Sequence, residues 1–470
     1  MPRTRPAAPA SGVTRRARAP GANTSVAPAR RCAFAVLRRV FEEGAYADRA
    51  LHAEADGLET RDRALATHLS YGAVQRRATL DHVIETLAGR PVSDLDPPVL
   101  AALRLGTFEL LYSRGAAAHA AVNDAVELAK GRRSGGEGLV NAVLRRTSRE
   151  GRALLAGLDD RTPEGAALLH SVPDWIARSW WEEFGPEEAR ALMASANEPA
   201  EAALRANTLM CSATELRGQL PVGARLDPGL PEALVLEGPF DAHGSELWER
   251  GAFMPQSRAS MLVARALDPQ PGERILDLCA APGAKTTHIA ALMEDRGSVV
   301  AVERHPGRAE ALRRTCRRMG VTSVTVEVAD AGQARVPDDR FDRVLVDPPC
   351  SGLGTLQARP DLRWRASPAR VEALAEEQRG TLGAAAGALR PGGVLVYSTC
   401  TLSAAENEDQ IGRFLEAHPD FEPVVPGPAL GEWRHPDLPG ALRSLPHRHR
   451  SDGFFIALLR RNKCAGAGAE

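Results

Sequence analysis

The chain has 470 residues, of which 44% are hydrophobic and 25% charged, and its formal net charge is −1 at pH 7. This composition excludes a largely disordered or fibrous protein, and the length predicts about three domains of roughly 150 residues each. The near-zero net charge excludes a globally basic nucleic-acid binder, although basic residues can still cluster locally.

The seven cysteines form no C-x-x-C pair and no Cys/His spacing of the kind that binds zinc. An odd number of cysteines without such spacing argues against a disulfide framework and against a metal site. No run approaches the ~18 to 20 apolar residues that a membrane span needs. We therefore expect a cytoplasmic protein in a reducing compartment, with no metal and no membrane partner.

The first residues of the chain are basic and rich in Ala and Pro, and the first acidic residue is Glu42. This composition predicts a disordered basic arm over residues 1–29. Such an arm could tether RNA, and a solvated tail without a function fits the composition equally well.

Residues 30–155 have the apolar periodicity of helices, which predicts an all-helical domain. In the run R-C-A-F-A-V-L-R-R-V-F, apolar side chains recur with a period of 3.6 residues. Further periodic runs cover Arg61–Gln75, Leu80–Leu87, Pro98–Tyr112 and Ala120–Lys130.

Residues 162–268 have weaker signals of mixed type, which predict a small α+β domain. The run A-L-R-A-N-T-L, Ala203–Leu209, is typical of a strand. Trp175, Trp180 and Trp181 occur on one predicted helix, and we expect them to pack in a core rather than to stack on bases, since large aromatic side chains at helical spacing usually pack.

From residue 269 to residue 463 short apolar strands alternate with helices, which predicts a mostly parallel, doubly wound α/β sheet. Ligands of such sheets bind at the carboxyl ends of the strands, near the point where the strand order reverses. The P-G-G sequence at 391–393 predicts a turn before the fifth strand. The predicted strands are Arg274–Leu278, Ser298–Val302, Val324–Val328, Phe341–Val346, Val394–Ser398 and Phe454–Leu459, and the predicted helices are Thr286–Met293, Arg308–Met319, Pro368–Leu389 and Ala404–His418.

The loop after the first of these strands reads L-D-L-C-A-A-P-G-A-K-T-T. Its small residues let the backbone approach a ligand, Gly283 can take a positive φ, and a helix N-terminus follows. The loop is neither G-x-G-x-x-G nor a Walker A sequence, which disfavours a dinucleotide cofactor and nucleotide hydrolysis. Glu303 and Asp330 follow the next two strands; either one alone would be an ordinary solvated acid, but together they favour a nucleoside ligand without phosphates.

Two thiols follow two further strands, in V-D-P-P-C and in S-T-C. The two prolines stiffen the loop that presents Asp347 and Cys350. A lone cysteine such as Cys400 would usually be a small buried hydrophobe. Two thiols at neighbouring strand ends favour nucleophilic or acid–base chemistry instead.

These motifs together resemble the S-adenosylmethionine-dependent RNA cytosine-5 methyltransferases of the Sun type. The resemblance lies in D-L-C-A-A-P-G-A-K-T-T, in D-P-P-C-S-G-L-G-T-L-Q-A-R-P-D-L-R-W, in S-T-C-T-L-S-A-A-E-N-E and in D-G-F-F-I-A-L. The helical region, with A-H-A-A-V-N-D-A-V-E-L-A-K, is similar to a NusB-type RNA-binding domain. The resemblance implies a Rossmann-like class I methyltransferase domain and methylation of a cytosine in small-subunit (16S) ribosomal RNA. The sequence departs from the family pattern at two places. Gly283-Ala284 stands where two glycines are usual, and M-P-Q-S, residues 254–257, stands where Q-D is more frequent.

The resemblance also implies roles for individual residues. Glu303 would bind the ribose of S-adenosylmethionine, Asp330 the adenine, and Asp347 the space beside the methyl group. Cys400 would be the nucleophile and Cys350 would assist its release. The methionine part of the cofactor would be bound by Cys279, Ala280, Ala281, Pro282, Gly283, Ala284 and Lys285.

This chemistry requires two thiols because C5 of cytosine is a poor nucleophile until a thiolate adds to C6. Asp347, protonated or sharing a proton, would meet the charge at N3, and Lys285 would lower the pKa of Cys400 or bind the cofactor carboxylate. The base must leave its stack, so we expect locally single-stranded or opened RNA. Arg359, Arg363 and Arg365 beside Trp364 are candidates for phosphate and base contacts, or equally for a solvated surface.

Two alternatives stay open at this point. One is a transfer RNA substrate for the same reaction. The other is a catalytically inert RNA-binding assembly factor, against which the presence of both thiols, Asp347 and Lys285 argues.

Overall fold

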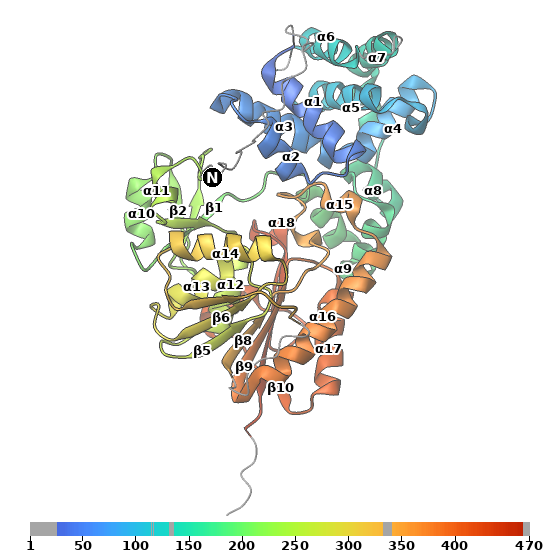
Figure 1. Ribbon diagram of the computed structural model, residues 1–470. Helices are drawn as coiled ribbons and strands as arrows, with labels where there is room; N and C mark the ends of the chain where they lie inside the picture. The colour runs from blue at the N-terminus through green and yellow to red at the C-terminus, as the bar shows by residue number, and fades with distance from the viewer. Residues whose placement is uncertain (1–25, 114, 116, 131–135, 332–340, 464–470) are drawn as a thin grey trace, which may run out of the picture.

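The computed structural model describes residues 26–113, 115, 117–130, 136–331 and 341–463. Most of the predicted basic arm, residues 1–25, lies outside the described residues. Figure 1 shows three parts: a bundle of helices, a small sheet with short helices, and a large sheet with helices on both faces. Within the described part of the chain no helix is long and apolar enough to cross a membrane.

The first part is helical, as predicted. The periodicity missed two of its helices, α2 and α7. The helix α5 is apolar on nearly all sides and lies at the centre of the bundle, against α1, α3, α4, α6 and α7. Gly72 allows α3 to approach α5, because a Cβ there would lie 1.9 Å from the ring of Phe108. The helices are α1 (Pro28–Glu42), α2 (Ala47–Glu54), α3 (Thr60–Gln75), α4 (Arg77–Ala88), α5 (Pro97–Tyr112), α6 (Ala118–Ala129) and α7 (Gly136–Ala156).

Two helices, α8 (Pro163–His170) and α9 (Asp174–Ser195), connect this bundle to the second part. Trp180 on α9 is 2% exposed, and its two neighbouring tryptophans pack against the same hydrophobic cluster, which confirms the core role predicted for them. The second part is a four-stranded antiparallel sheet in the order β2-β3-β1-β4. Its elements are β1 (Ala203–Ala206), α10 (Ala213–Gln219), β2 (Ala224–Leu226), β3 (Ala233–Leu236), α11 (Glu246–Glu249) and β4 (Phe253–Pro255).

The third part contains an eight-stranded sheet whose main path has the order β10-β12-β9-β8-β5-β6-β7, with β11 paired to β12. Strands β5 to β9 are parallel, and β12 runs antiparallel to β9. The order reverses between β5 and β8, and such a reversal opens a crevice at the carboxyl ends of the two strands. The strands are β5 (Arg274–Asp277), β6 (Ser298–Val302), β7 (Val324–Glu327), β8 (Phe341–Val346), β9 (Leu389–Thr399), β10 (Phe421–Pro423), β11 (Ala441–Ser444) and β12 (Phe454–Arg461).

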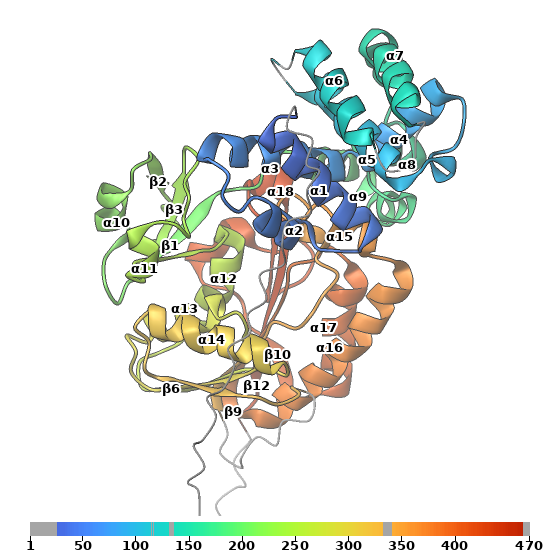
Figure 2. The same ribbon diagram turned by 45° about the horizontal axis from the view of Figure 1, so that its top comes forward.

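Helices cover both faces of this sheet (Figure 2). Successive side chains of a strand point to opposite faces. Accordingly, Ile275 packs in the cluster that contains α12 and α13, whereas Leu276 packs with α16 and α17. The helices are α12 (Arg258–Leu267), α13 (Ala284–Leu292), α14 (Pro306–Arg318), α15 (Leu362–Arg365), α16 (Pro368–Ala388), α17 (Glu408–Ala417) and α18 (Pro446–His449).

Two predicted elements differ from the structure. The P-G-G sequence does not end a loop before the fifth strand; it lies within β9, where the pairing with β8 shifts register between Phe341 and Arg343. The predicted helix Ala404–His418 is divided into a short 3-10 turn and α17, because Asn407 takes a non-helical backbone conformation with φ −122° and ψ −96°.

Candidate active site

The loop between β5 and α13 lies at the reversal of strand order. Asp277 ends β5, is fully buried, and accepts a hydrogen bond from Thr286 Oγ1 at 2.8 Å. Its other oxygen, Oδ1, is buried without a hydrogen-bond partner among the described residues. Burial raises the pKa of Asp277 to about 7. Gly283 caps α13 with φ 106°, and a Cβ there would meet Leu312 at 2.6 Å, so this position requires glycine.

The two predicted thiols lie next to each other. The Sγ atoms of Cys350 and Cys400 are 3.4 Å apart, although the residues are fifty positions apart in sequence, and both side chains are partly exposed. Cys350 follows β8 and Cys400 follows β9, which are paired in parallel. The parallel register brings the two strand ends, and therefore the thiols, to one edge of the sheet.

A buried polar network holds the two thiol loops together. The carboxylate of Glu406 accepts hydrogen bonds from the backbone N–H of Ser351 at 2.9 Å and from its hydroxyl. Gln378 Nε2 on α16 donates to Glu406 and to the carbonyl of Pro349, both at 3.0 Å. Ser351 also contacts Thr401 at 2.6 Å, directly after Cys400. Buried groups that are all paired in this way fix the positions of both loops.

Glycine backbones form a second connection behind Cys400. Gly354 N donates to the carbonyl of Cys400 at 3.0 Å, and Gly453 N donates to the carbonyl of Gly354 at 2.8 Å. A Cβ on Gly354 would lie 2.1 Å from the carbonyl oxygen of Gly453. The two backbone segments could therefore not approach so closely with any larger residue at position 354.

Lys285 and Asp347 form an ion pair beside the thiols. Lys285 Nζ lies 2.6 Å from Asp347 Oδ2, and Ser398 Oγ donates to Asp347 Oδ1 at 2.8 Å. The ammonium also lies 5.1 Å from the centroid of the Phe454 ring, within the range of a cation–π contact. Both carboxylate oxygens act as acceptors here, so the proton-sharing role predicted for Asp347 stays a prediction for the complex with substrate.

The two thiols differ in acidity. The hydrogen bond from Cys350 lowers the pKa of Cys400, with further lowering by Arg359 and Lys285, against the opposing effect of burial. The same hydrogen bond, together with burial, raises the pKa of Cys350 well above the usual range. Burial also raises the pKa of the third nearby thiol, Cys279. Of these three thiols, Cys400 is the one that the surroundings favour as a thiolate.

This difference predicts the pH dependence of alkylation. Because thiolates react and thiols do not, iodoacetamide should modify Cys400 at a rate that levels off at a lower pH than an ordinary cysteine, while Cys350 reacts only at higher pH. Replacement of Lys285 by Met should shift the Cys400 profile to higher pH, since it removes a charge that lowers the pKa. Peptide mass spectrometry between about pH 6 and 10 measures both rates. Modification of Cys350 at the lower pH would contradict the assignment.

Glu303 and Asp330 lie after the next two strands, as predicted. Glu303 is 4% exposed; its carboxylate accepts from His305 N at 2.9 Å and lies 3.4 Å from Arg308. Arg308 also donates to the carbonyl of Ala281 in the loop after β5, at 2.7 Å. Asp330 is exposed, three residues after the end of β7.

The RNA contact predicted for Arg363 is wrong, because this side chain is completely buried at 0% exposure. It donates to the carbonyls of Ser171 and Ala196 at 3.0 and 2.8 Å, and to that of Gln75 in the helical bundle at 3.2 Å. Trp364 Nε1 donates to the carbonyl of Val74 at 2.7 Å, so it also joins the bundle to the third part.

Arg365 has contacts of the same kind. It stacks on Tyr46 at 4.2 Å and donates to the carbonyl of Gly44, both in the helical bundle. Of the three predicted arginines, Arg359 has an exposed side chain near the thiols.

Sequence reasoning missed several residues around the thiols. Ser398, Glu406 and Phe454 all lie inside motifs that were singled out, but their roles depend on partners from other strands. Asp452 was missed as well. Burial raises its pKa, and the nearby charges of Arg359 and Lys285 oppose this rise. Its place in D-G-F-F-I-A-L was the available signal.

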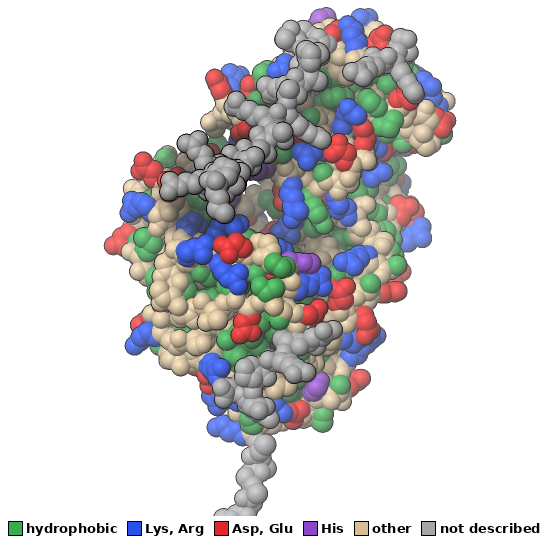
Figure 3. Space-filling view, in the orientation of Figure 1, with side chains coloured by type: hydrophobic (Ala, Val, Ile, Leu, Met, Phe, Trp, Pro, Cys, Tyr) green, Lys and Arg blue, Asp and Glu red, His purple; other side chains and the backbone are tan. Residues whose placement is uncertain are grey.

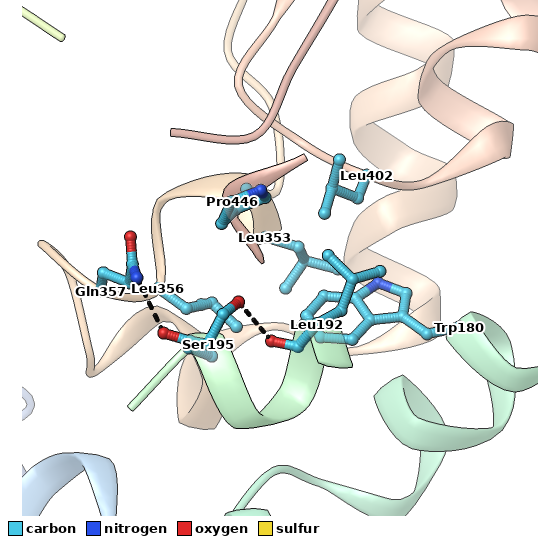
Figure 4. Close-up of a pocket in the computed structure, with 10 residues that line it drawn as sticks. Trp180, Leu192, Ser195, Leu353, Leu356, Gln357, Leu402 and Pro446 are labelled. Carbon is cyan, nitrogen blue, oxygen red and sulfur yellow. Dashed lines mark hydrogen bonds between the residues drawn. The ribbon is translucent and has the colours of Figure 1, made fainter. Parts of the chain in front are cut away.

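A small apolar pocket lies between α9 and the loop that follows Cys350 (Figure 4). Gln357 donates to the carbonyl of Ser195 at 2.8 Å at its edge, and Ser195 Oγ donates to the carbonyl of Leu192 at 2.8 Å. None of the predicted site residues lines it. We interpret it as a packing gap between two parts of the chain.

The strand order, the glycine-capped loop at the reversal and the acids at the next strand ends define the third part as a Rossmann-like class I methyltransferase domain. Residues 264–460 match the family described as 16S rRNA methyltransferase RsmB/F, residues 27–149 match the NusB family, and residues 172–243 match the ferredoxin-like domain of RsmF/B-like methyltransferases. The chain belongs to the RsmB/F family of 16S rRNA methyltransferases.

Relatives match over most of their length. The chain is 40% identical to a probable ribosomal RNA small subunit methyltransferase B from Synechocystis, covering 92% of this chain and 99% of the relative. It is 38% identical to ribosomal RNA small subunit methyltransferase B from Thermus thermophilus, over 85% and 89% of the two chains.

Solved structures match as well. The crystal structure of PH0851 is 28% identical with a TM-score of 0.80, over 93% of this chain and 99% of that one. The structure of NSun6 from Pyrococcus horikoshii with SFG is 27% identical with a TM-score of 0.56, over 63% of this chain and all of that one.

Proposed function

We propose that this methyltransferase modifies C5 of one cytosine in small-subunit ribosomal RNA, uses S-adenosylmethionine, and proceeds through a covalent bond between Cys400 and C6 of the base. The observation that carries the proposal is the pair of thiols 3.4 Å apart beside the ion pair of Lys285 and Asp347. We keep 30–155, 162–268 and 269–463 as the proposed limits of the three domains.

The residues present fit S-adenosylmethionine. Glu303 is a buried carboxylate at the tip of the strand next to β5, where an acid can accept from both ribose hydroxyls. The loop from Cys279 to Lys285 ends at the N-terminus of α13, which favours a carboxylate. Asp330 would bind the adenine, and Asp347 would lie beside the methyl group. When bound, the cofactor supplies an electrophilic methyl group.

Cys400 begins the reaction as a thiolate. Its sulfur bonds to C6, and the electrons of the C5–C6 double bond move toward C5 and N3. A proton donated by Asp347 neutralises the negative charge at N3. After C5 has been methylated, its proton passes to water, the electron pair of that C–H bond forms the C5–C6 double bond, and the electron pair of the C6–S bond leaves with the sulfur of Cys400 in the same step. The proton on N3 returns to Asp347.

Cys350 assists this last step as a hydrogen-bond donor. Its raised pKa keeps it protonated, and its hydrogen bond stabilises the thiolate of Cys400. A thiol with a lower pKa is a better leaving group, so the same contact that favours attack also accelerates release.

The substrate base must leave its stack to reach the thiols, so the target is a locally single-stranded or opened segment. Lys and Arg side chains border a hollow between the helical bundle and the methyltransferase domain on the face shown in Figure 3. Exposed arginines beside a hollow suit phosphate contacts.

The test is bisulfite sequencing of ribosomal and transfer RNA from a strain that lacks the gene. We expect one 5-methylcytosine to disappear from 16S rRNA and to return with the wild-type gene but not with the Cys400→Ala gene. Loss of a methylcytosine from a transfer RNA would identify that substrate instead. No lost methylcytosine in either RNA would support the inert assembly factor.

A further inference from the structure

A buried arginine of the small antiparallel sheet reaches the start of α13. Arg205 on β1 is 1% exposed; its Nη1 donates to the carbonyl of Ala284 and to Oε1 of Gln256, and its Nη2 donates to Thr287 Oγ1 at 2.9 Å. The hydroxyl of Thr287 in turn donates to the carbonyl of Gly283 at 2.7 Å. Arg205 is therefore connected to two consecutive carbonyls at the N-terminus of α13.

The contacts of Arg205 are unusual for a buried charge. Among the described residues, each of its hydrogen-bond acceptors is neutral, and its Nε has no partner. The nearby acid Glu232 is bound instead to His288 at 2.8 Å and to Arg265 at 2.5 Å. A buried guanidinium without a bound carboxylate adds little to stability by itself. Its fork geometry does, however, fix several acceptors at once.

We propose that Arg205 is a positioning residue for the cofactor: it holds Gly283 and Ala284 in the conformation that binds the methionine part of S-adenosylmethionine. This inference rests on the proposed function. It gives the small sheet a part in cofactor binding, although the sheet lies outside the Rossmann-like domain. Lys285, the next residue after Ala284, forms the ion pair with Asp347. The contact of Arg205 with the Ala284 carbonyl therefore also fixes the backbone from which the Lys285 side chain reaches Asp347.

Arg205 contacts both positions at which the chain departs from the usual family sequence. Gln256 belongs to the M-P-Q-S segment and accepts a hydrogen bond from Arg205, so this segment orients the guanidinium. Ala284 replaces a usual glycine, and Arg205 contacts its carbonyl oxygen, an atom that both residues possess.

The test compares two buried arginines at the same junction. Arg258 is also buried and joins the small sheet to the large one, with Glu201 at 2.6 Å and Asp227 at 2.9 Å, but its other contacts are the carbonyls of His449 and Arg450. We expect Arg205→Met to weaken binding of S-adenosylhomocysteine about tenfold or more in calorimetry, because hydrogen bonds from a charged group are lost. RNA affinity should stay within about twofold.

Arg258→Met should lower the melting temperature but leave the affinity for S-adenosylhomocysteine unchanged. Wild-type affinity in folded Arg205→Met, or equal weakening by both variants, would overturn the inference. If Arg205→Met does not fold, Thr287→Val replaces it: about threefold weaker binding supports the inference, and unchanged binding overturns it. Failure of the wild-type protein to bind S-adenosylhomocysteine would instead contradict the proposed function.

Discussion

The Cys350→Ala protein is expected to remain covalently attached to its RNA in a denaturing gel after incubation with S-adenosylmethionine. In the wild-type site the thiol of Cys350 lies 3.4 Å from Cys400 and stabilises it as a thiolate. A hydrogen bond to a charged group contributes roughly 1.5 to 3 kcal/mol, so its loss reduces the stabilisation of the departing thiolate by that amount. Release of the RNA is then slower by about 10 to 100-fold. The attached complex should therefore accumulate.

Cys400→Ala is the control for this experiment. Cys400→Ala has no sulfur to add to C6, so it should form no complex and methylate no RNA. The double variant should behave as Cys400→Ala does. Accumulation of the complex in Cys400→Ala, with none in Cys350→Ala, would exchange the two roles.

Replacement of Asp347 by Asn should reduce the single-turnover rate of methylation by about 10² to 10⁴-fold, the usual range for a group that handles a proton. The substitution keeps the shape of the side chain but removes the negative charge that Lys285 approaches at 2.6 Å. It leaves the largely buried ammonium of Lys285 without its counter-charge. It also removes the carboxyl group that is proposed to donate a proton to N3 of the base.

Ser398→Ala is the matched control for Asp347→Asn. It deletes one hydrogen bond to the same carboxylate, at 2.8 Å, and leaves the ion pair in place. We expect a decrease of about tenfold. The melting temperature should be measured for both variants to establish that each is folded. A rate for Asp347→Asn within a few-fold of the wild-type rate, or equal losses in both variants, would contradict the role of the charge.

Much of the methyltransferase domain could be predicted from the sequence, because each strand is a short apolar run and the chemical motifs follow strand ends. Ser298–Val302 and Phe341–Val346 were predicted with the bounds that the structure has. Parallel pairing then brings Cys350 and Cys400 together, which needs no further information than the strand order.

The parts that could not be predicted depend on partners far away in sequence. Arg363 lies between Leu362 and Trp364 in a basic stretch that is typical of an exposed surface, yet its acceptors come from the helical bundle and from the residues that directly follow α8 and α9. Nothing in the local pattern identifies these carbonyls. The same holds for Glu406, whose partners lie on the loop after β8 and on α16, and for Arg205, whose partners are Gln256 and the start of α13.

The buried arginines suggest that the outer parts of the chain support the active-site loops directly. Arg363 also donates to the carbonyl of Leu356 at 3.3 Å, in the loop after Cys350, while Arg205 holds the loop after β5. A displacement of catalytic groups by about 1 Å can lower the rate by about 100-fold. We therefore expect the helical bundle and the small sheet to affect the chemistry as well as the binding of RNA.

The most direct measurement of the central claim is mass spectrometry of the complex that Cys350→Ala forms with its RNA, after digestion of both the protein and the nucleic acid. The account predicts the added mass of a methylated cytidine nucleotide on the peptide that contains Cys400. An added nucleotide on any other peptide, or the absence of a covalent complex from a protein that still binds RNA and S-adenosylhomocysteine, would contradict it.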